Sequence, residues 1–313
     1  MKILITGCAG FIGSHLCEKL LKDTVYDIYG IDNINDYYNI NIKLNNLSIL
    51  KKYDKFHFEK DDIVTTKIIS KIKPNIVINL AAMAGVRYSL SNPCLYIKNN
   101  VEGQTNLLNQ CILNNVKLFI YASSSSVYGT NKKVPFSEND DIKNVNSPYA
   151  ASKLNCEIMA KLYSKLYNLN TIGLRFFTVY GPRGRPDMAP YKFLTNIMNN
   201  KKFDKFGSGN SYRDYTYIDD IVSGIIGAIK NKNNKKCEVY NLGNSNIVSL
   251  NEFIETCEKV TNQKAIYNQL DDQTGDVPIT YSDINKAKND LDYCPSTLLH
   301  EGLTKMYNWL LNN

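Results

Sequence analysis

The most restrictive feature of the sequence is a glycine-spaced turn near its start. Gly7, Gly10 and Gly13 stand between a short apolar run at residues 2–6 and a helical pattern at about 11–22. Small residues at this spacing let the backbone turn sharply and let a diphosphate approach the N-terminus of the helix, where N–H groups and the helix dipole favour phosphate. The turn therefore predicts a dinucleotide-binding site at the first strand–helix junction.

Two carboxylates strengthen this prediction and select the dinucleotide. Asp32 ends the second predicted strand, about 20 residues after the glycines, where a carboxylate can accept hydrogen bonds from both ribose hydroxyls. A carboxylate at that place repels a 2′-phosphate, so NAD is expected rather than NADP. Asp62 follows the third predicted strand, within reach of the adenine amino group.

The pattern beyond the turn predicts an α/β fold. Strands are expected at residues 2–6, 28–31, 57–59, 76–79, 117–122 and 171–174, and helices at about 11–22, 40–52, 65–72, 94–114 and 148–168. Such alternation is typical of a doubly wound parallel sheet of the Rossmann type. A strand at 238–242 can rejoin the sheet. We therefore predict an NAD-binding domain at 1–175 and 218–247, with a smaller, interleaved substrate-binding α/β region at 176–217 and 248–313.

Within the region 248–313 the sequence predicts helices separated by a loop around 275–278. Before it, a helix is expected at 190–200, a strand near 212–217 and another helix at 219–230.

A candidate catalytic set follows the fifth predicted strand. Tyr149 and Lys153 lie four residues apart in one predicted helix, so their side chains share a face. An ammonium beside a phenol favours the phenolate, the form that acts as a general base on a sugar hydroxyl. Ser124 belongs to a run of four serines at the carboxyl end of the predicted sheet, where it can hydrogen-bond the reacting oxygen.

Composition excludes several classes of protein. Lys and Arg number 37 against 30 Asp and Glu, a formal net charge of +7, but the lysines are scattered in short runs, so no nucleic-acid partner is expected. No apolar run approaches the roughly 18–20 residues that span a bilayer, so we expect a cytoplasmic protein with no membrane partner. The eight cysteines show neither a CxxC pair nor zinc spacing, so no metal is expected.

Further motifs give nearly the whole chain a resemblance to a known family. They are GxxGxxG at 7–13, Asp62-Ile63, Asn79-Leu80-Ala81-Ala82, Ser124, Tyr149-x-x-x-Lys153 and RDYTYIDD at 213–220. Together they resemble the extended short-chain dehydrogenase/reductase superfamily, in particular its nucleotide-sugar epimerases and dehydratases. The stretches at 84–89, 121–129, 176–182, 184–189 and 275–278 are most similar to UDP-glucuronate 4-epimerases.

The resemblance implies a tightly held NAD and a UDP-sugar substrate. Tyr149 would take the proton of the sugar 4-hydroxyl while C4 gives its hydride to the nicotinamide, and the hydride would return to the opposite face of the 4-keto sugar. Lys153 would bind the nicotinamide ribose, and Ser124 would hold the 4-oxygen. The implied cofactor-binding residues are Gly7, Gly10, Phe11, Ile12, Gly13, Asp32, Asn33, Asp62, Ile63, Leu80, Ala81, Ala82, Asn100, Tyr149, Lys153 and Phe176.

The implied substrate-binding residues include most of the few arginines of the chain. They are Arg87, Ser125, Ser126, Thr178, Arg185, Arg213 and Asp276. A planar guanidinium grips phosphate or carboxylate with two parallel hydrogen bonds, which a lysine cannot do. Arg213 and Asp276 are assigned to the nucleotide, and Arg87 and Arg185 to the anionic end of the substrate. A structural salt bridge or helix cap remains the alternative for each arginine, including Arg175 and Arg183.

Two departures from the family pattern keep rival functions open. Met83 stands where glucuronate epimerases commonly have Gln, and Asp61 where the family usually has Gly. The first rival is a nucleotide-sugar 4,6-dehydratase, which needs an acid and a base where this chain has Ser125 and Ser126, unless it recruits other groups such as Cys94 or Glu138. A UDP-glucose or UDP-N-acetylglucosamine 4-epimerase is the second rival, and a catalytically silent NAD- or RNA-binding relative the third. A homodimer is expected, formed through the two long helices at 94–114 and 148–168.

Overall fold

Seven parallel strands form the central sheet of the molecule. A computed structural model describes residues 1–231, 236–271 and 277–312, so Asp276 lies outside the described residues. The strands are β1 (Lys2–Thr6), β2 (Asp27–Asp32), β3 (Phe56–Lys60), β4 (Ile76–Asn79), β5 (Leu118–Ser124), β6 (Thr171–Phe176) and β10 (Cys237–Leu242). Their order is β10-β6-β5-β4-β1-β2-β3, so the chain runs outward from β1 in one direction and then from β4 in the other. The predicted doubly wound sheet is confirmed.

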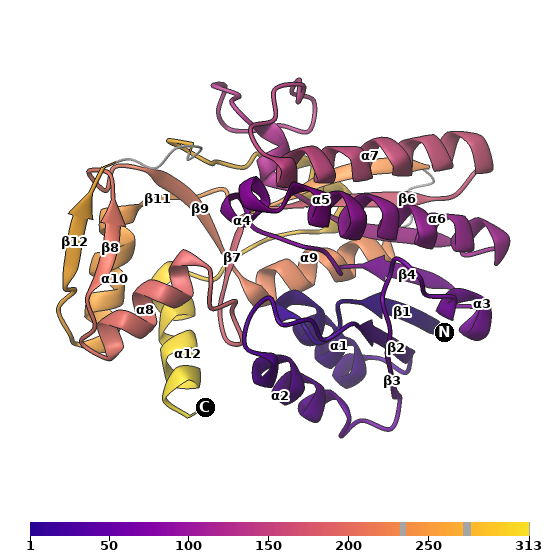
Figure 1. Cartoon of the computed structure of the whole chain (residues 1–313), viewed down its shortest axis with the longest axis horizontal. Coiled ribbons are helices and arrows are strands. Elements are labelled where there is room, and N and C mark those ends of the chain that lie inside the picture. Colours follow the sequence, from indigo (N-terminus) through magenta and orange to yellow (C-terminus); the bar gives the residue numbers. More distant parts are fainter. Residues whose placement is uncertain (232–235, 272–276, 313) are drawn as a thin grey trace.

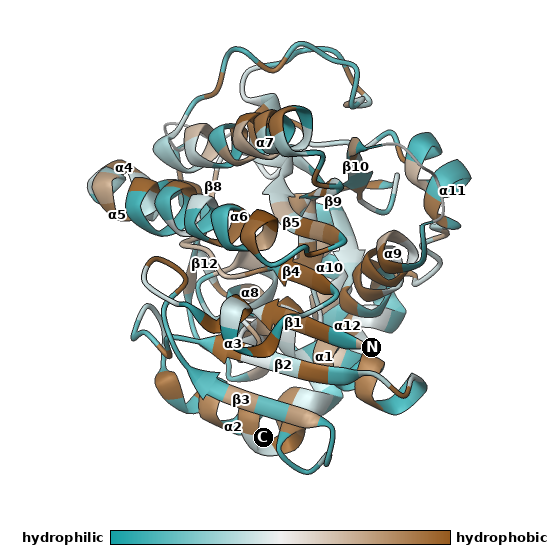
Figure 2. Cartoon of the chain, turned by 90° about the vertical axis from the view of Figure 1, so that its right-hand side faces the viewer, coloured by the Kyte–Doolittle hydropathy of each residue, from teal (hydrophilic) through white to brown (hydrophobic). Residues whose placement is uncertain are grey.

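Helices cover both faces of this sheet (Figure 1). One face packs against α1 (Phe11–Asp23), α2 (Ile40–Leu50) and α9 (Ile218–Lys230), and the other against α3 (Ile68–Ile72), α6 (Gly103–Leu113) and α7 (Pro148–Tyr167). The middle strands are apolar on both faces because both are buried, which Figure 2 shows as a brown centre in β1, β4 and β5. Among the described residues, no helix combines the length and the apolar content that crossing a bilayer requires.

A second lobe, at the left of Figure 1, is built around two small sheets. The first sheet joins β7 (Thr178–Tyr180), β9 (Tyr212–Tyr217) and β11 (Ile247–Ser249), and the second joins β8 (Phe203–Phe206) and β12 (Tyr267–Leu270). Its helices are α8 (Ala189–Met198), α10 (Leu250–Thr261) and α12 (Leu299–Leu311), whereas α11 (Asn285–Leu291) packs against α9 and β10 of the main sheet. Short segments next to the main sheet are α4 (Val86–Ser91), α5 (Pro93–Tyr96), the π-helical η1 (Ile97–Glu102) and the 3₁₀-helical η2 (Ser125–Tyr128).

In the second lobe the sequence pattern predicted β9, expected near 212–217, but missed the other four strands, of which β8 and β12 show the reason. All four residues of β12 are exposed, and β8 carries charged residues at two of its four positions, so neither has the apolar signal of a core strand. They exist because they pair with each other in parallel, from Tyr267 opposite Phe203 to Leu270 opposite Phe206. Residues 248–313 therefore contain strands as well as the expected helices. The division into two interleaved domains stays a prediction.

A buried polar network fastens α7 to the carboxyl ends of the strands. The Arg175 guanidinium on β6 donates from Nε and Nη2 to the two carboxylate oxygens of Glu157 on α7, at 2.9 and 2.8 Å. Ser123 at the end of β5 donates to the same carboxylate at 2.5 Å, and Arg175 Nη1 donates to the Tyr128 hydroxyl at 2.9 Å. That hydroxyl donates to Asn241 Oδ1 on β10 at 2.7 Å. Because every member is buried and paired, the network fixes α7 relative to three strands.

Breaking this ion pair should destabilise the protein strongly. Arg175→Met leaves the Glu157 carboxylate buried without its cation, and we expect a loss of about 3–5 kcal/mol in the free energy of unfolding. Urea unfolding measures this loss. The double variant Arg175→Met/Glu157→Leu should recover part of it, because no charge is then left unpaired. Lys143→Met breaks the exposed pair with Asp141 and should change the stability by less than about 1 kcal/mol. A similar loss in both single variants would contradict the interpretation.

Candidate functional site

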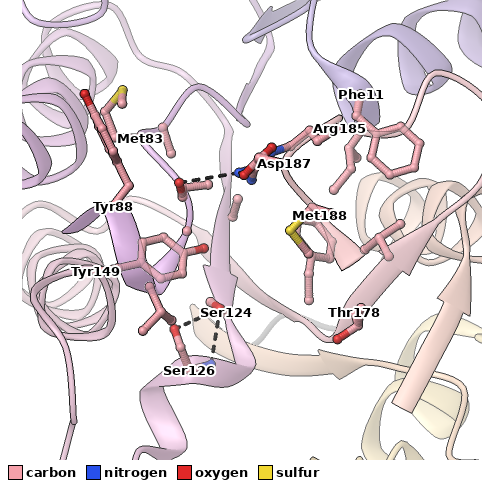
Figure 3. Close-up of a pocket in the computed structure, with 18 of the residues that line it drawn as sticks. Phe11, Met83, Tyr88, Ser124, Ser126, Tyr149, Thr178, Arg185, Asp187 and Met188 are labelled. Carbon is pink, nitrogen blue, oxygen red and sulfur yellow. Dashed lines mark hydrogen bonds and ion pairs between the residues drawn. The ribbon is translucent and has the colours of Figure 1, made fainter. Parts of the chain in front are cut away.

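A cavity of about 1000 Å³ opens where the two lobes meet. Its floor is the carboxyl ends of β1, β4 and β5, which include the point where the strand order reverses, and its far wall comes from β7, β8 and β9. Ligands of doubly wound sheets bind at such switch points. The cavity brings together most of the residues that the sequence assigns to cofactor and substrate (Figure 3).

The glycine turn forms one end of the cavity and has no room for side chains. Gly7 has a φ of +69°, and a Cβ there would lie 2.8 Å from the Ala81 backbone nitrogen. A Cβ on Gly13 would overlap the Gly7 carbonyl oxygen. No side chain caps α1 at its N-cap residue Gly10, so the N–H groups of its first turn face the cavity without a side-chain partner. This cradle suits a diphosphate.

Asp32 lies beside the turn with its carboxylate fixed by two backbone groups. It accepts hydrogen bonds from Ala9 N at 3.2 Å and Ile34 N at 2.9 Å. Burial raises the pKa of Asp32, while these bonds and the nearby Lys43 ammonium act in the opposite direction. Asn33 also lines the cavity. Asp32 therefore lines the cavity directly beside the glycine turn.

Two further polar residues on the same wall, not expected from the sequence, are Asn35, between β2 and α2, and Lys43 in the first turns of α2. Lys43 is 5% exposed, and its Nζ donates to Asn35 O at 2.9 Å and to Asn35 Oδ1 at 2.8 Å. The ammonium lies 4.9 Å from the centre of the Tyr38 ring, and burial lowers the pKa of Lys43. A lysine in an amphipathic helix usually faces solvent, so periodicity gave no signal for this position.

Two residues of the predicted cofactor set do not line the cavity. Asp62 accepts hydrogen bonds from Asn33 Nδ2 at 3.0 Å and from Val64 N at 2.9 Å. Asn100 is buried beneath the cavity and bonds Met83 N and O, at 2.8 and 2.9 Å, and Ser152 Oγ at 2.9 Å. Both residues therefore fix segments that do line the cavity.

The three candidate catalytic side chains converge from β5 and α7. Ser147 caps the N-terminus of α7, where its hydroxyl accepts from Ala150 N, and Tyr149 lies in the first turn, facing the cavity (Figure 3). Lys153 is one turn further on, 4% exposed, and its Nζ donates to the Ala122 carbonyl at 2.8 Å. The Tyr149 ring meets the edge of the Tyr96 ring at a centroid distance of 5.9 Å.

The serines after β5 form a tight 3₁₀ turn whose hydrogen bonds orient Ser124. Its Oγ accepts from Ser126 N at 3.2 Å and from Ser126 Oγ at 2.9 Å (Figure 3). Because Ser124 Oγ accepts both of these bonds, its own O–H proton is available to donate to a ligand oxygen. Ser125, Ser126, Thr178 and Met83 also line the cavity, and the side chain of Met83 is mostly buried.

The five arginines divide into two groups. Arg87, Arg185 and Arg213 line the cavity, and the Arg87 guanidinium lies 5.6 Å from the centre of the Phe206 ring on β8. Arg175 and Arg183 do not line it and instead form ion pairs away from it, with Glu157 and Glu18. The structural alternative therefore holds for these two. Among the described residues, no group of three or more His, Cys, Asp or Glu side chains is placed to hold a metal ion.

The fold and the cavity define an extended short-chain dehydrogenase/reductase, and comparison with known proteins identifies the family. The family model described as GDP-mannose 4,6 dehydratase matches residues 4–306. The chain belongs to this family of nucleotide-sugar enzymes, as the motifs predicted.

Individual relatives match over nearly their whole length. Protein CapI from Staphylococcus aureus is 45% identical, over 99% of this chain and 98% of that protein. UDP-glucuronate 4-epimerase from Thermodesulfobacterium geofontis is 40% identical, over 99% of this chain and 96% of that protein. The solved structure of UDP-glucuronic acid 4-epimerase from Bacillus cereus in complex with UDP-glucuronic acid and NAD has a TM-score of 0.95 at 36% identity, covering 100% of this chain and 99% of that chain.

A methyl group in the glycine turn should selectively damage cofactor binding. Gly13→Ala forces α1 away from the Gly7 carbonyl at a cost of about 1–3 kcal/mol, so the affinity for NAD should fall about tenfold or more. Titration with NAD, followed by quenching of intrinsic fluorescence, measures the affinity. Gly10→Ala is the matched control, because its Cβ would lie 3.2 Å from the same oxygen and needs a smaller shift. Equal losses in the two variants would contradict the role of the close approach at Gly13.

Proposed function

We propose that this protein is an NAD-dependent UDP-glucuronate 4-epimerase. The observation that carries the proposal is one cavity in which a dinucleotide-binding turn, the Tyr149–Lys153–Ser124 set and Arg185 face the same space. The similarity to UDP-glucuronate 4-epimerases over almost the whole chain supports the same activity.

The residues at the first end of the cavity fit NAD. The first turn of α1 would hold its diphosphate, Asp32 and Asn33 its adenosine ribose, and Lys153 its nicotinamide ribose. When bound, NAD supplies the acceptor that takes the C4 hydride of the sugar and returns it to the opposite face. Gly7 and Gly13 keep the start of α1 close to β1, and the Asp32 carboxylate would repel a 2′-phosphate.

Tyr149 and its neighbours handle the proton of the sugar 4-hydroxyl. The phenolate of Tyr149 would take this proton as the 4-keto sugar forms and give it back when the hydroxyl is restored. Lys153 lies one turn after Tyr149 on α7 and is buried, and its Nζ donates to the Ala122 carbonyl at 2.8 Å at the end of β5. Ser124, whose hydroxyl proton is available, would donate to the 4-oxygen throughout.

The second end of the cavity has the chemistry for a charged sugar and a nucleotide diphosphate. Ser125, Ser126 and Thr178 would offer hydroxyl donors to the sugar, and Arg185 would face its carboxylate. Arg87 and Arg213 would serve the diphosphate side. Asp276, assigned to the nucleotide by family resemblance, lies outside the described residues.

The positions directly after Ser124, where a 4,6-dehydratase of this family would carry its acid and base, hold serines in this chain. Ser125 and Ser126 occupy the positions after Ser124, and a serine hydroxyl neither protonates a leaving hydroxyl well nor abstracts a C5 proton. The two substitutes considered from the sequence, Cys94 and Glu138, are not among the lining residues. Glu138 instead accepts from Asn241 N at 2.8 Å, and burial raises the pKa of this carboxyl. The described part of the cavity therefore favours epimerisation.

Tyr149→Phe should abolish most turnover while leaving NAD bound. Losing the acid–base group should lower kcat by about 10²- to 10⁴-fold.

NMR-monitored incubation of the wild-type protein in heavy water with UDP-glucuronate, UDP-glucose and UDP-N-acetylglucosamine identifies the substrate and the reaction together. We expect the 4-epimer of UDP-glucuronate without deuterium at C5. A 6-deoxy-4-keto product with deuterium at C5 would establish a dehydratase, and undiminished turnover by the variant would remove Tyr149 from the mechanism.

We also propose that the protein forms a homodimer through the outer face of α7. Ile158, Leu162 and Leu166 are 54%, 42% and 59% exposed and recur every four residues, which makes one apolar stripe. Helix α6 packs beside α7, and its last residue Leu113 is 78% exposed. An exposed apolar stripe of this kind suits the same stripe of a second copy. The cytoplasmic location stays a prediction.

Leu162→Glu should give a folded monomer. A carboxylate at the centre of the stripe opposes self-association, because dimer formation would bury it next to the same carboxylate of the second subunit. Light scattering after size exclusion measures the mass. Leu311→Glu makes the same change at a 58% exposed leucine on α12, on the opposite side of the molecule in Figure 1, and should keep the wild-type mass. A monomeric wild type, or a dimeric Leu162→Glu, would contradict the proposal.

A further inference from the structure

The Arg185 guanidinium is held by a second residue of its own loop. Its Nε donates to Asp187 Oδ1 at 3.1 Å, and its Nη2 donates to Asp187 Oδ2 at 2.5 Å. Both residues line the cavity opposite Ser124 and Tyr149 (Figure 3). We propose that Asp187 is a positioning residue that sets the orientation of Arg185 and thereby the preference for a sugar that carries a carboxylate. This inference rests on the proposed function and deepens it.

Asp187 occupies one defined edge of the guanidinium. A guanidinium has five N–H donors, and Asp187 takes the edge formed by Nε and Nη2. Nη2 also approaches the Ala84 carbonyl at 3.5 Å. Within the described part of the chain, Nη1 makes no hydrogen bond to the protein. The ion pair therefore leaves the Nη1 end of Arg185 to a ligand and fixes the direction in which it points.

Tyr37 holds the other partner of the pair. Its hydroxyl donates to Asp187 Oδ2 at 3.3 Å, and its ring lies 5.6 Å from the Arg185 guanidinium carbon. Burial and the neighbouring Asp187 carboxylate raise the pKa of the Tyr37 phenol, so the hydroxyl remains a donor at neutral pH. Gly85 leaves room for this arrangement, since a Cβ there would lie 3.1 Å from the Tyr37 hydroxyl. Asp187 is thus fixed by a second contact besides Arg185.

The loop that carries the pair is anchored on α1. The His15 ring nitrogen Nε2 hydrogen-bonds the Pro182 carbonyl at 2.9 Å, and Arg183 forms an ion pair with Glu18. Burial lowers the pKa of His15 to about 4, so the ring is neutral at physiological pH and donates this bond. Arg185 and Asp187 therefore stand on a loop whose base is tied to the helix of the cofactor turn.

In this geometry, the preference for a sugar carboxylate over a neutral hydroxymethyl group depends on the direction in which the Arg185 guanidinium points. The Arg185–Asp187 pair has no net charge, so it attracts a carboxylate through the directed donors at Nη1 and only weakly through its overall field. A neutral hydroxymethyl group gains much less from the same donors. Loss of Asp187 frees the long Arg185 side chain to adopt other rotamers, and ordering it again opposes binding of the carboxylate.

A double-mutant cycle on the NAD-loaded protein tests this inference. Asp187→Asn, Arg185→Met and the double variant are made in a Tyr149→Phe background, and calorimetry gives Kd for UDP-glucuronate and for UDP-glucose. Asp187→Asn should weaken UDP-glucuronate about tenfold and UDP-glucose by less than about twofold. In the Arg185→Met background, Asp187→Asn should weaken UDP-glucuronate no further. Tyr37→Phe should act in the same direction as Asp187→Asn, with a smaller effect.

The controls separate positioning from folding and from the proposed function. Asp23→Asn makes the same chemical change at an exposed position of α1 and should leave both Kd values unchanged. NAD content and thermal unfolding report whether each variant is folded. Tighter binding of UDP-glucuronate by Asp187→Asn would make Asp187 a competitor of the substrate and overturn the inference, as would equal losses for both sugars or the same loss without Arg185. A wild-type protein that does not epimerise UDP-glucuronate would instead overturn the proposed function.

Discussion

The buried ion pair between Arg175 and Glu157 holds together the parts on which the candidate chemistry depends. Glu157 follows Lys153 by one turn of α7, and Ser123, which donates to the same carboxylate, directly precedes Ser124. The pair therefore sets the position of the helix that carries Tyr149 relative to the strand that carries Ser124. Paired buried charges of this kind contribute little net stability, but they disfavour every packing that leaves one charge alone.

The close approach of Gly7 and Gly13 plays the corresponding role at the other end of the cavity. It brings the start of α1 against β1 and the segment after β4, at the point where the strand order reverses. Helix α1 is also joined to the loop 181–188 through His15 and Glu18. One helix thus supports both the glycine turn and the loop of Arg185, so the proposed cofactor and sugar sites share a rigid element.

The scarcity of arginine acquires a physical meaning once the contacts are known. Arg175 and Arg185 each bind a carboxylate through Nε and Nη2, a fork geometry that lysine cannot reproduce. Arg183 pairs with Glu18. Arg87 and Arg213 line the cavity. In this lysine-rich chain, Arg175 and Arg185 thus occupy positions where a carboxylate is bound by two directed hydrogen bonds from one planar group.

The sequence by itself determined the doubly wound sheet, the dinucleotide turn and the Tyr149–Lys153–Ser124 set, because each depends on local periodicity or on fixed spacing along one element. Tertiary structure alone decided that β8 and β12 pair, that Lys43 turns inward, and that Asp62 and Asn100 support the cavity wall from behind. It also decided which arginines face the cavity, and it joined Asp187 and Tyr37, 150 residues apart, around Arg185. Such contacts depend on how distant segments pack, and no spacing within a single element encodes them.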